Sequence, residues 1–377
     1  MKGKTFAILL LVAGLLVALA LFRTGNDAGT TGPKMGDKLF ADLPVNQVAE
    51  VALADAGTRT TLVKGEAVWQ VRERSGYPAD FDQLRDTVVK LSRLKIGRSF
   101  AGDSESLARL SLMPPSDPNA SARGTRITLK DASGNMLADL VLGQVRSKED
   151  GGNGGQYLKK ADDETVFLVD ASFRFLKTAP TEWLQKEILN IKADAVESVT
   201  CYAGEDQEPV YTLVRDEKGK DAELTPIPHG RSADANRIDQ VMEALAPLTL
   251  DDVQPVEAPP ASASERPRLV YHLFDGREID IFPASDGEES YTLRVAAREP
   301  AMAAKAKTPS AEERSPEAEK VEERKEDETE KAQEPAPRSA KEINDALGPW
   351  VFSIKKWQYD SFVTQPESLL EELKKEE

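Results

Sequence analysis

Apolar and polar residues alternate along several short stretches of the chain, with the period expected of strands that bury one face. Three such runs follow one another early in the chain: VAEVALAD at 48–55, TTLVKG at 60–65 and VWQVRE at 68–73. Two longer stretches, at 125–143 and 267–284, each consist of an apolar run, a glycine-containing turn and a second apolar run. We interpret both as β-hairpins.

A helical period appears twice, in YPADFDQLRDTVVKLSRL at 77–94 and in RSADANRIDQVMEALAPL at 231–248. Apolar residues three and four positions apart form one face of each helix, and Asp80 and Asp234 occupy the same place before the two runs. An aspartate at this place accepts hydrogen bonds from the first-turn amides and favours the positive end of the helix dipole. We therefore interpret the two aspartates as helix caps and not as catalysts.

The two helices belong to a longer internal repeat. Residues of the flanking strands match in pairs: Val48 with Val196, Gly134 with Gly276, Phe167 with Phe352 and Leu184 with Leu370. The pattern predicts an α+β fold of two tandem repeats, each a mostly antiparallel sheet with a capped amphipathic helix, preceded by one transmembrane helix. The predicted divisions are an anchor at 1–23, a tether at 24–44, the first repeat at 45–192, the second repeat at 193–297 and 348–377, and an insertion at 298–347.

The insertion has a composition of its own. Between Ala301 and Ala340 it has no aromatic residue, and Glu, Lys and Pro dominate. Such a stretch buries too little apolar surface to offset the entropy of ordering it, so we expect disorder, with a solvated spacer favoured over a partner-binding segment. The strand near 291–295 should then pair with the one near 350–354 on the far side of the insertion.

The N-terminus carries an uninterrupted apolar run from Phe6 to Phe22, preceded by Lys2 and Lys4. This length is near the lower limit for a membrane-spanning helix. A cleaved signal peptide with Ala18-Leu19-Ala20 as its processing site is the alternative, but the apolar run continues past that site. The lysines favour the cytoplasm, which predicts a single-pass protein of a bacterial inner membrane with most of its chain in the periplasm.

Charge and rare residues exclude several functions. The net charge of −16 argues against binding nucleic acid or an anionic membrane surface. Cys201 is the only cysteine and replaces Leu53 of the first copy, which predicts a buried strand position. The only histidines, His229 and His272, have no neighbours at a zinc-site spacing, so catalytic zinc is not expected.

Three further stretches resemble functional motifs only loosely. The segment 97–101 (GRSFA) lacks the last glycine of a nucleophile elbow and is interpreted as the end of a strand that leads into a short helix, SESLARLSL. The segment 151–155 (GGNGG) lacks the lysine of a phosphate loop and is interpreted as a hairpin loop. The acidic groups Asp275, Glu278, Asp280 and Asp286, Glu288, Glu289 lack the calcium-loop pattern and are interpreted as solvated turns. No catalytic, cofactor-binding or metal-binding residue is therefore predicted.

The order of these motifs along the chain resembles the bacterial family called domain of unknown function forty-three-forty. The residues that carry the resemblance are Trp69-Gln70-Val71, Tyr77 to Asp80, Leu110 to Pro114, Leu142-Gly143, Tyr157, Val166 to Val169 and Trp183. The resemblance is clearest over 45–248. It implies a single-pass envelope protein encoded beside gliding-type ABC transporter components, and it supplies no catalytic residues.

Together these observations predict a protein without enzymatic activity that is held in the inner membrane through Phe6 to Phe22. It would serve as an accessory or scaffold for an ABC-type transporter or another envelope complex, with proteins as its partners. A binding module for an envelope polymer is one alternative, which would use exposed aromatics such as Trp69, Trp350 and Trp357. An unrecognised hydrolase is another, which would require carboxylates that converge on His272 in one pocket.

Overall fold

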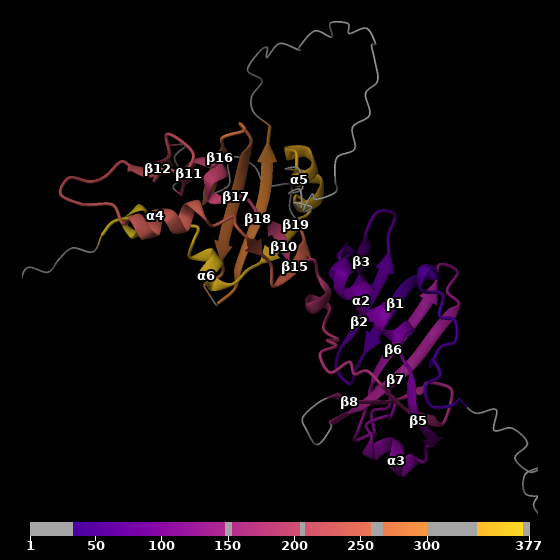
Figure 1. Cartoon of the computed structure of the whole chain (residues 1–377). Helices are drawn as coiled ribbons and strands as arrows, with labels where there is room; N and C mark the ends of the chain where they lie inside the picture. The colour runs from indigo at the N-terminus through magenta and orange to yellow at the C-terminus, as the bar shows by residue number, and fades with distance from the viewer. Residues whose placement is uncertain are drawn as a thin grey trace, which may run out of the picture. The chain divides into compact units, whose positions relative to one another are not determined.

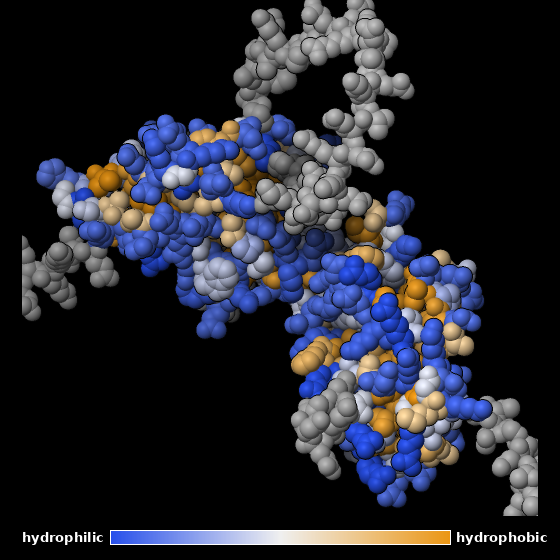
Figure 2. All heavy atoms as spheres, in the orientation of Figure 1, coloured by the Kyte–Doolittle hydropathy of each residue, from blue (hydrophilic) through white to orange (hydrophobic). Residues whose placement is uncertain are grey.

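A computed structural model describes residues 33–147, 153–203, 208–257, 267–287, 289–299 and 338–371. Among these residues, no helix has the length and apolar character needed to cross a membrane. The predicted anchor, Phe6 to Phe22, lies outside the described residues, and so does most of the predicted insertion. The chain forms two compact units, and Figure 2 shows mostly hydrophilic residues on the visible face of each.

Unit 1 contains the described residues up to Lys64 together with Asp82–Ala179. Its strands are β1 (Val48–Ala54), β2 (Arg59–Lys64), β5 (Ile96–Ala101), β6 (Thr125–Asp131), β7 (Met136–Ser147), β8 (Asn153–Lys160) and β9 (Thr165–Val169), and its helices are α2 (Phe81–Ser92) and α3 (Ser104–Arg109). The strands lie in the order β2-β1-β6-β7-β8-β9-β5, and neighbouring strands are antiparallel (Figure 1).

Unit 2 contains Gly65–Phe81 and the described residues from Pro180 onward. Its strands are β3 (Trp69–Val71), β4 (Tyr77–Pro78), β10 (Glu187–Leu189), β11 (Val196–Tyr202), β12 (Tyr211–Val214), β13 (Glu223–Thr225), β14 (Leu248–Thr249), β15 (Asp252–Pro255), β16 (Arg268–Leu273), β17 (Glu278–Ser285), β18 (Tyr291–Arg298) and β19 (Trp350–Ser353). Its helices are α4 (Ala235–Met242), α5 (Ala340–Leu347) and α6 (Lys356–Tyr359). The main sheet has the order β13-β12-β11-β16-β17-β18-β19-β15.

The two sheets therefore follow one topology, with β12, β11, β16, β17, β18, β19 and β15 in the places of β2, β1, β6, β7, β8, β9 and β5. The registers agree as well. Val51 lies opposite Leu62 and Leu129, and its counterpart Val199 lies opposite Leu213 and Tyr271. Both strands even share a register irregularity near their first residue. The prediction of mostly antiparallel sheets with few helices is confirmed.

The repeated helices bury the apolar faces that their periodicity predicts. Helix α2 buries Leu84, Val88 and Leu91. Helix α4 buries Ile238, Val241 and Met242, and the Asp234 carboxylate accepts hydrogen bonds from two first-turn amides, as expected of a cap. The Tyr271 hydroxyl donates to the Val241 carbonyl over 3.1 Å, which ties the end of α4 to β16. Tertiary packing, more than propensity, stabilises such short helices.

The segment 65–81 follows β2 in sequence but groups with unit 2. The Tyr77 ring meets the rings of Trp350 and Phe352 edge-on, at centroid distances of 5.2 and 6.2 Å. The Arg74 guanidinium binds both carboxylate oxygens of Asp252, at 2.5 and 3.0 Å. This geometry is the stronger, bidentate form of an ion pair. Unit 2 is thus completed by a segment that the sequence assigns to the first repeat.

The predicted tether does not extend to residue 44. Leu39 is buried, and its amide donates to the Leu94 carbonyl over 2.8 Å. The backbones of Lys38 and Lys95 form an isolated antiparallel β-bridge. In unit 2 the strand pair of β10 and β14 corresponds to this bridge, since β10 also precedes the first long strand of its unit and pairs with the chain after the repeated helix. Residues 36–39 therefore already belong to the fold of unit 1, held by the buried Leu39 side chain and by backbone hydrogen bonds to Leu94 and Ile96.

Strands β18 and β19 pair antiparallel, with Thr292 opposite Ser353 and Leu293 opposite Phe352. The prediction that strands on the two sides of the insertion pair is confirmed. The predicted boundaries of the disordered insertion, 298–347, are wrong at the C-terminal end, because residues 340–347 form α5. Ser339 caps this helix, and Ala340, Ile343 and Leu347 form its buried face.

Helix α5 satisfies an edge of β18 that β19 leaves open. The Asn344 side chain accepts from the Ala297 amide over 2.8 Å and donates to the Ala297 carbonyl over 2.7 Å. The Ala340 amide donates to the Glu299 carboxylate over 2.8 Å. The two ends of the segment 300–337 are thus held together at the sheet edge.

We expect Asn344→Ala to lower the free energy of unfolding of unit 2 by about 1–3 kcal/mol, because it leaves both backbone groups of Ala297 without their protein partner. Urea unfolding followed by tryptophan fluorescence measures the change. Lys341→Ala, on the exposed face of the same helix, is the control and should leave the transition in place. Equal effects from the two variants would contradict the proposed role of the amide.

Candidate functional site

The face of the unit 1 sheet that carries Ala52, Ala54 and Arg126 is only partly covered. Beside Arg126 on this face, Val141 forms an apolar cluster with Leu112 and Val166, to which α3 and the chain after it contribute. Strands β1 and β2 are not covered by α3 and the chain after it, and a groove of about 520 Å³ lies on this part of the sheet. Its lining residues are Ala52, Ala54, Asp55, Ala56, Gly57, Thr58, Arg59, Pro115, Ser116, Arg126, Thr128, Lys130 and Met136.

The floor of this groove consists of small side chains. Ala52 and Ala54 alternate along β1, and Thr128 lies opposite Ala52 on β6. Alternate residues of a strand point to the same face, so all three project into the groove. Pro115 borders the groove, and Met136 is an exposed apolar side chain beside it.

Two cations of the groove are held by carboxylates. The Arg126 guanidinium binds both oxygens of Asp139, at 2.8 and 2.5 Å, and the Lys130 ammonium lies 3.0 Å from Glu50. The bond to Asp139 raises the pKa of Arg126 above its usual value. The pairs remain partly open to solvent, with 39% of the Arg126 side chain and 16% of the Asp139 side chain exposed. They fix the two cations in place and leave other donor positions free.

The turn at one end of the groove is closed by hydrogen bonds to one carboxylate. The Asp55 carboxylate accepts hydrogen bonds from the amides of Gly57 and Thr58 and from the hydroxyls of Thr58 and Thr178. Desolvation raises the pKa of Asp55, but these hydrogen bonds outweigh it, and the net pKa lies below its usual value. Asp55 is therefore a structural anion whose acceptor capacity is used by the turn and by Thr178.

Unit 2 offers a comparison of the same scaffold with different side chains. At the places of Ala54 and Thr128 it has Tyr202 and Val270, as the paired registers show. The Tyr202 ring lies 5.1 Å from the Arg268 guanidinium, which corresponds to Arg126. Only 9% of Arg268 and 6% of its partner Asp280 are exposed. Among the described residues of unit 2, the Tyr202 ring and the buried pair of Arg268 with Asp280 thus take the places that Ala54 and the more open pair of Arg126 with Asp139 have in unit 1.

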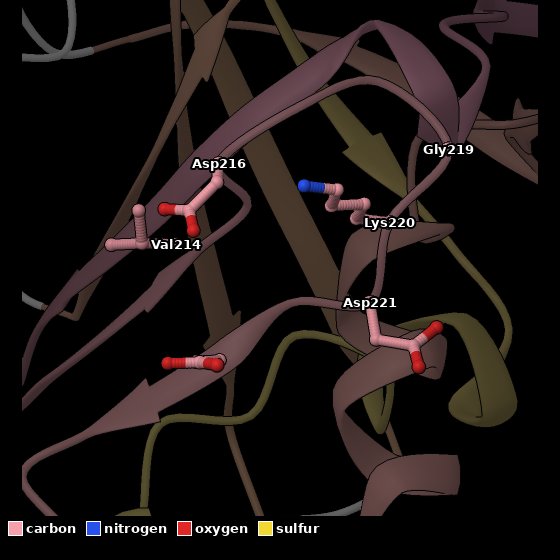
Figure 3. Close-up of a pocket in the computed structure, with 6 residues that line it drawn as sticks. Val214, Asp216, Gly219, Lys220 and Asp221 are labelled. Atoms are coloured by element: carbon pink, nitrogen blue, oxygen red, sulfur yellow. The ribbon is translucent and has the colours of Figure 1, made fainter.

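Unit 2 has a smaller depression of about 360 Å³ beside β12 and β13, shown in Figure 3. It is lined by Val214, Asp216, Gly219, Lys220, Asp221 and Glu223. In Figure 3 the carboxylates of Asp216 and Asp221 lie apart from each other, and the Lys220 ammonium is 3.0 Å from Glu217. This arrangement is typical of a solvated polar loop.

The rare residues singled out in the sequence do not meet in one site. His272 Nδ1 lies 3.3 Å from Glu278, but the other oxygen of Glu278 binds Arg298 at 3.0 Å. His229 is exposed, and neither depression is lined by a histidine. Cys201 is buried in β11, as predicted, and burial raises the pKa of its thiol to about 12. A thiol in this state is a poor nucleophile.

The remaining motifs also have structural places. Residues 97–101 lie in β5 and are followed by α3, as predicted. Strand β8 begins at Asn153, so the predicted glycine loop is shorter than GGNGG, and residues 151 and 152 lie outside the described residues. Asp275 pairs with Arg277 in a turn, but the interpretation of Asp280 as part of a solvated turn is wrong, because it is buried in β17 and pairs with Arg268. Within the described ranges no group of His, Cys, Asp or Glu is arranged to hold a metal ion, and Glu288 is not among those residues.

The aromatic residues considered for polymer binding differ in exposure. Trp357 is 60% exposed on α6, whereas Trp69 and Trp350 are half-buried and Trp350 packs against Tyr77. None of the three lines either depression.

Two antiparallel sheets of one topology, one with an open polar groove, define a tandem-repeat α+β protein. Residues 69–267, more than half of the chain, match the family described as Domain of unknown function (DUF4340). The chain belongs to this family. No curated protein and no solved structure matches it.

Proposed function

We propose that the chain is a non-enzymatic accessory or scaffold protein of an ABC-type transporter or envelope complex, anchored in the bacterial inner membrane with its two units in the periplasm. The observation that carries the proposal is the duplicated sheet, in which one copy has a groove where the other carries a tyrosine ring and a buried ion pair. Duplication followed by divergence of one surface suits docking to another protein, because the filled copy adds stability and the open copy adds recognition. The apolar run from Phe6 to Phe22 supports the anchor.

The proposal is tested in cells with the full chain tagged at its C-terminus. We expect the protein to stay with the membrane fraction after alkaline carbonate washing. A lysine-reactive crosslinker added to intact cells should join it to a permease or ATPase subunit of a transporter, identified by mass spectrometry. A variant without residues 5–22 but with a cleavable secretion signal should be released and lose this product. A full chain that carbonate extracts, or that crosslinks only to soluble proteins, would contradict the proposal.

A further inference from the structure

The groove of unit 1 has unused hydrogen-bond donors but few unused acceptors. Arg126 binds Asp139 through Nε and Nη2, which leaves Nη1, and Lys130 has one carboxylate partner for its three protons. Arg59 lines the groove without a partner among the described residues. The Asp55 carboxylate, by contrast, already accepts from four donors. Arg59 is thus the cation of the groove without a carboxylate partner among the described residues, and Arg126 and Lys130 add N–H donors, so the groove can accept anionic groups although the net charge of the chain is −16.

The small side chains of the floor determine which part of an anionic ligand can lie on it. Ala52 and Ala54 of the floor and Pro115 at the border offer an apolar surface on which the hydrocarbon part of a ligand can pack. A ligand that fits therefore places an apolar stem on the floor and its charges toward the rim. Aspartate and glutamate side chains on an extended peptide have this form, since the backbone and the alternate side chains follow the strands.

The spacing of the cations specifies the ligand further. Arg126 and Lys130 lie on one face of β6 with Thr128 between them, so their Cα atoms are roughly 13 Å apart at the rise of a strand. We infer that the groove binds an extended acidic segment of a protein partner, with two carboxylates four residues apart. This inference deepens the proposed function and rests on it, because it gives the chemistry of the segment through which a partner docks.

A carboxylate ligand is favoured over a phosphate. Both cations of β6 already share their charge with Asp139 and Glu50, so they offer directed N–H groups with little net charge. Phosphate sites usually combine unpaired cations with several backbone amides. At the place of Ala54, unit 2 has the ring of Tyr202, so a ligand that needs this space would bind unit 1 and not unit 2.

The test uses the full chain in detergent and the blocked peptide Ala-Glu-Val-Thr-Val-Glu-Ala, whose β-branched residues favour an extended form. Calorimetry measures its Kd at low and at physiological salt. We expect binding that weakens at least tenfold when both glutamates become glutamine and when Arg59→Gln and Lys130→Gln are combined. Ala54→Tyr, which copies unit 2 and changes no charge, should abolish binding. Arg98→Gln, an exposed arginine on β5 outside the groove, is the matched control and should bind as the unchanged protein does.

Each outcome is informative. Absence of binding, or binding that Ala54→Tyr leaves unchanged, overturns the inference. Displacement of the peptide by tripolyphosphate at an equal concentration would assign the groove to phosphate ligands and also overturn it. Circular dichroism of each variant checks that unit 1 is folded. If the peptide fails to bind while the transporter crosslink persists in cells, the groove assignment fails and the proposed scaffold function stands.

Discussion

Replacing Asp280 with alanine should lower the free energy of unfolding of unit 2 by about 3–5 kcal/mol. The Asp280 carboxylate is almost fully buried and accepts from Arg268 and from Arg298, each over 2.9 Å. Its removal leaves the buried Arg268 charge without the carboxylate that compensates it. All four tryptophans lie in unit 2, so tryptophan fluorescence during urea unfolding reports on this unit alone.

The matched control is Asp139→Ala, the equivalent position of unit 1. Its pair with Arg126 is partly exposed, and exposed pairs contribute about 0–1 kcal/mol. The tryptophan transition of this variant should not move, and far-UV circular dichroism, which reports on both units, shows any change in unit 1 as a shift that the tryptophan signal does not share. A loss for Asp280→Ala no larger than that for Asp139→Ala would contradict the assigned difference in burial.

Ending the chain at Leu347 should abolish the cooperative unfolding of unit 2, whereas deleting residues 301–336 should leave it intact. Strand β19 lies between β18 and β15 and is hydrogen-bonded to both, so its loss divides the sheet. It also removes the ring of Phe352, which is completely buried, and a buried phenylalanine is worth about 3–5 kcal/mol.

The internal deletion, closed with a four-residue glycine-serine linker, removes none of the described contacts. Its ends already meet through Glu299 and Ala340. Each halving of the connecting length lowers the entropic cost of closure by about 0.6 kcal/mol, so stability should stay level or rise. Thermal unfolding of both variants decides the matter. An internal deletion that damages unit 2 as much as the truncation would show that the insertion stabilises the fold.

Much of the fold could be predicted from the sequence because it depends on local patterns. Alternation gave β1, β2 and the hairpins, and the helical period gave α2 and α4. The pairing of β18 with β19 followed from the repeat, since Phe352 stands where Phe167 does. Helix α5 also had a local signal, the capping residues Ser339 and Glu342, but its position next to a charged stretch concealed it.

The groove and the packing of residues 65–81 could not be predicted in this way. The contact of Tyr77 with Trp350 joins distant parts of the chain and has no periodic signature. The groove depends on the difference between Ala54 and Tyr202, which the alignment of Cys201 with Leu53 already makes equivalent, but the repeat alone does not show that this strand face is left uncovered. A residue-by-residue comparison of the copies at outward strand positions is the signal that could have found it.

The placement of residues 65–81 bears on how this gene can change. A recombination that removes the first copy, with a breakpoint near residue 192, also removes Arg74 and Tyr77, and unit 2 then lacks the partners of Asp252 and Trp350. The reverse event leaves Arg74 without Asp252 and Tyr77 without the rings of Trp350 and Phe352. A duplication in which a segment of the first copy packs within unit 2 cannot return to a single copy in one step without losing these contacts. Selection for folding alone is then enough to preserve both copies, and the surface of each is free to diverge.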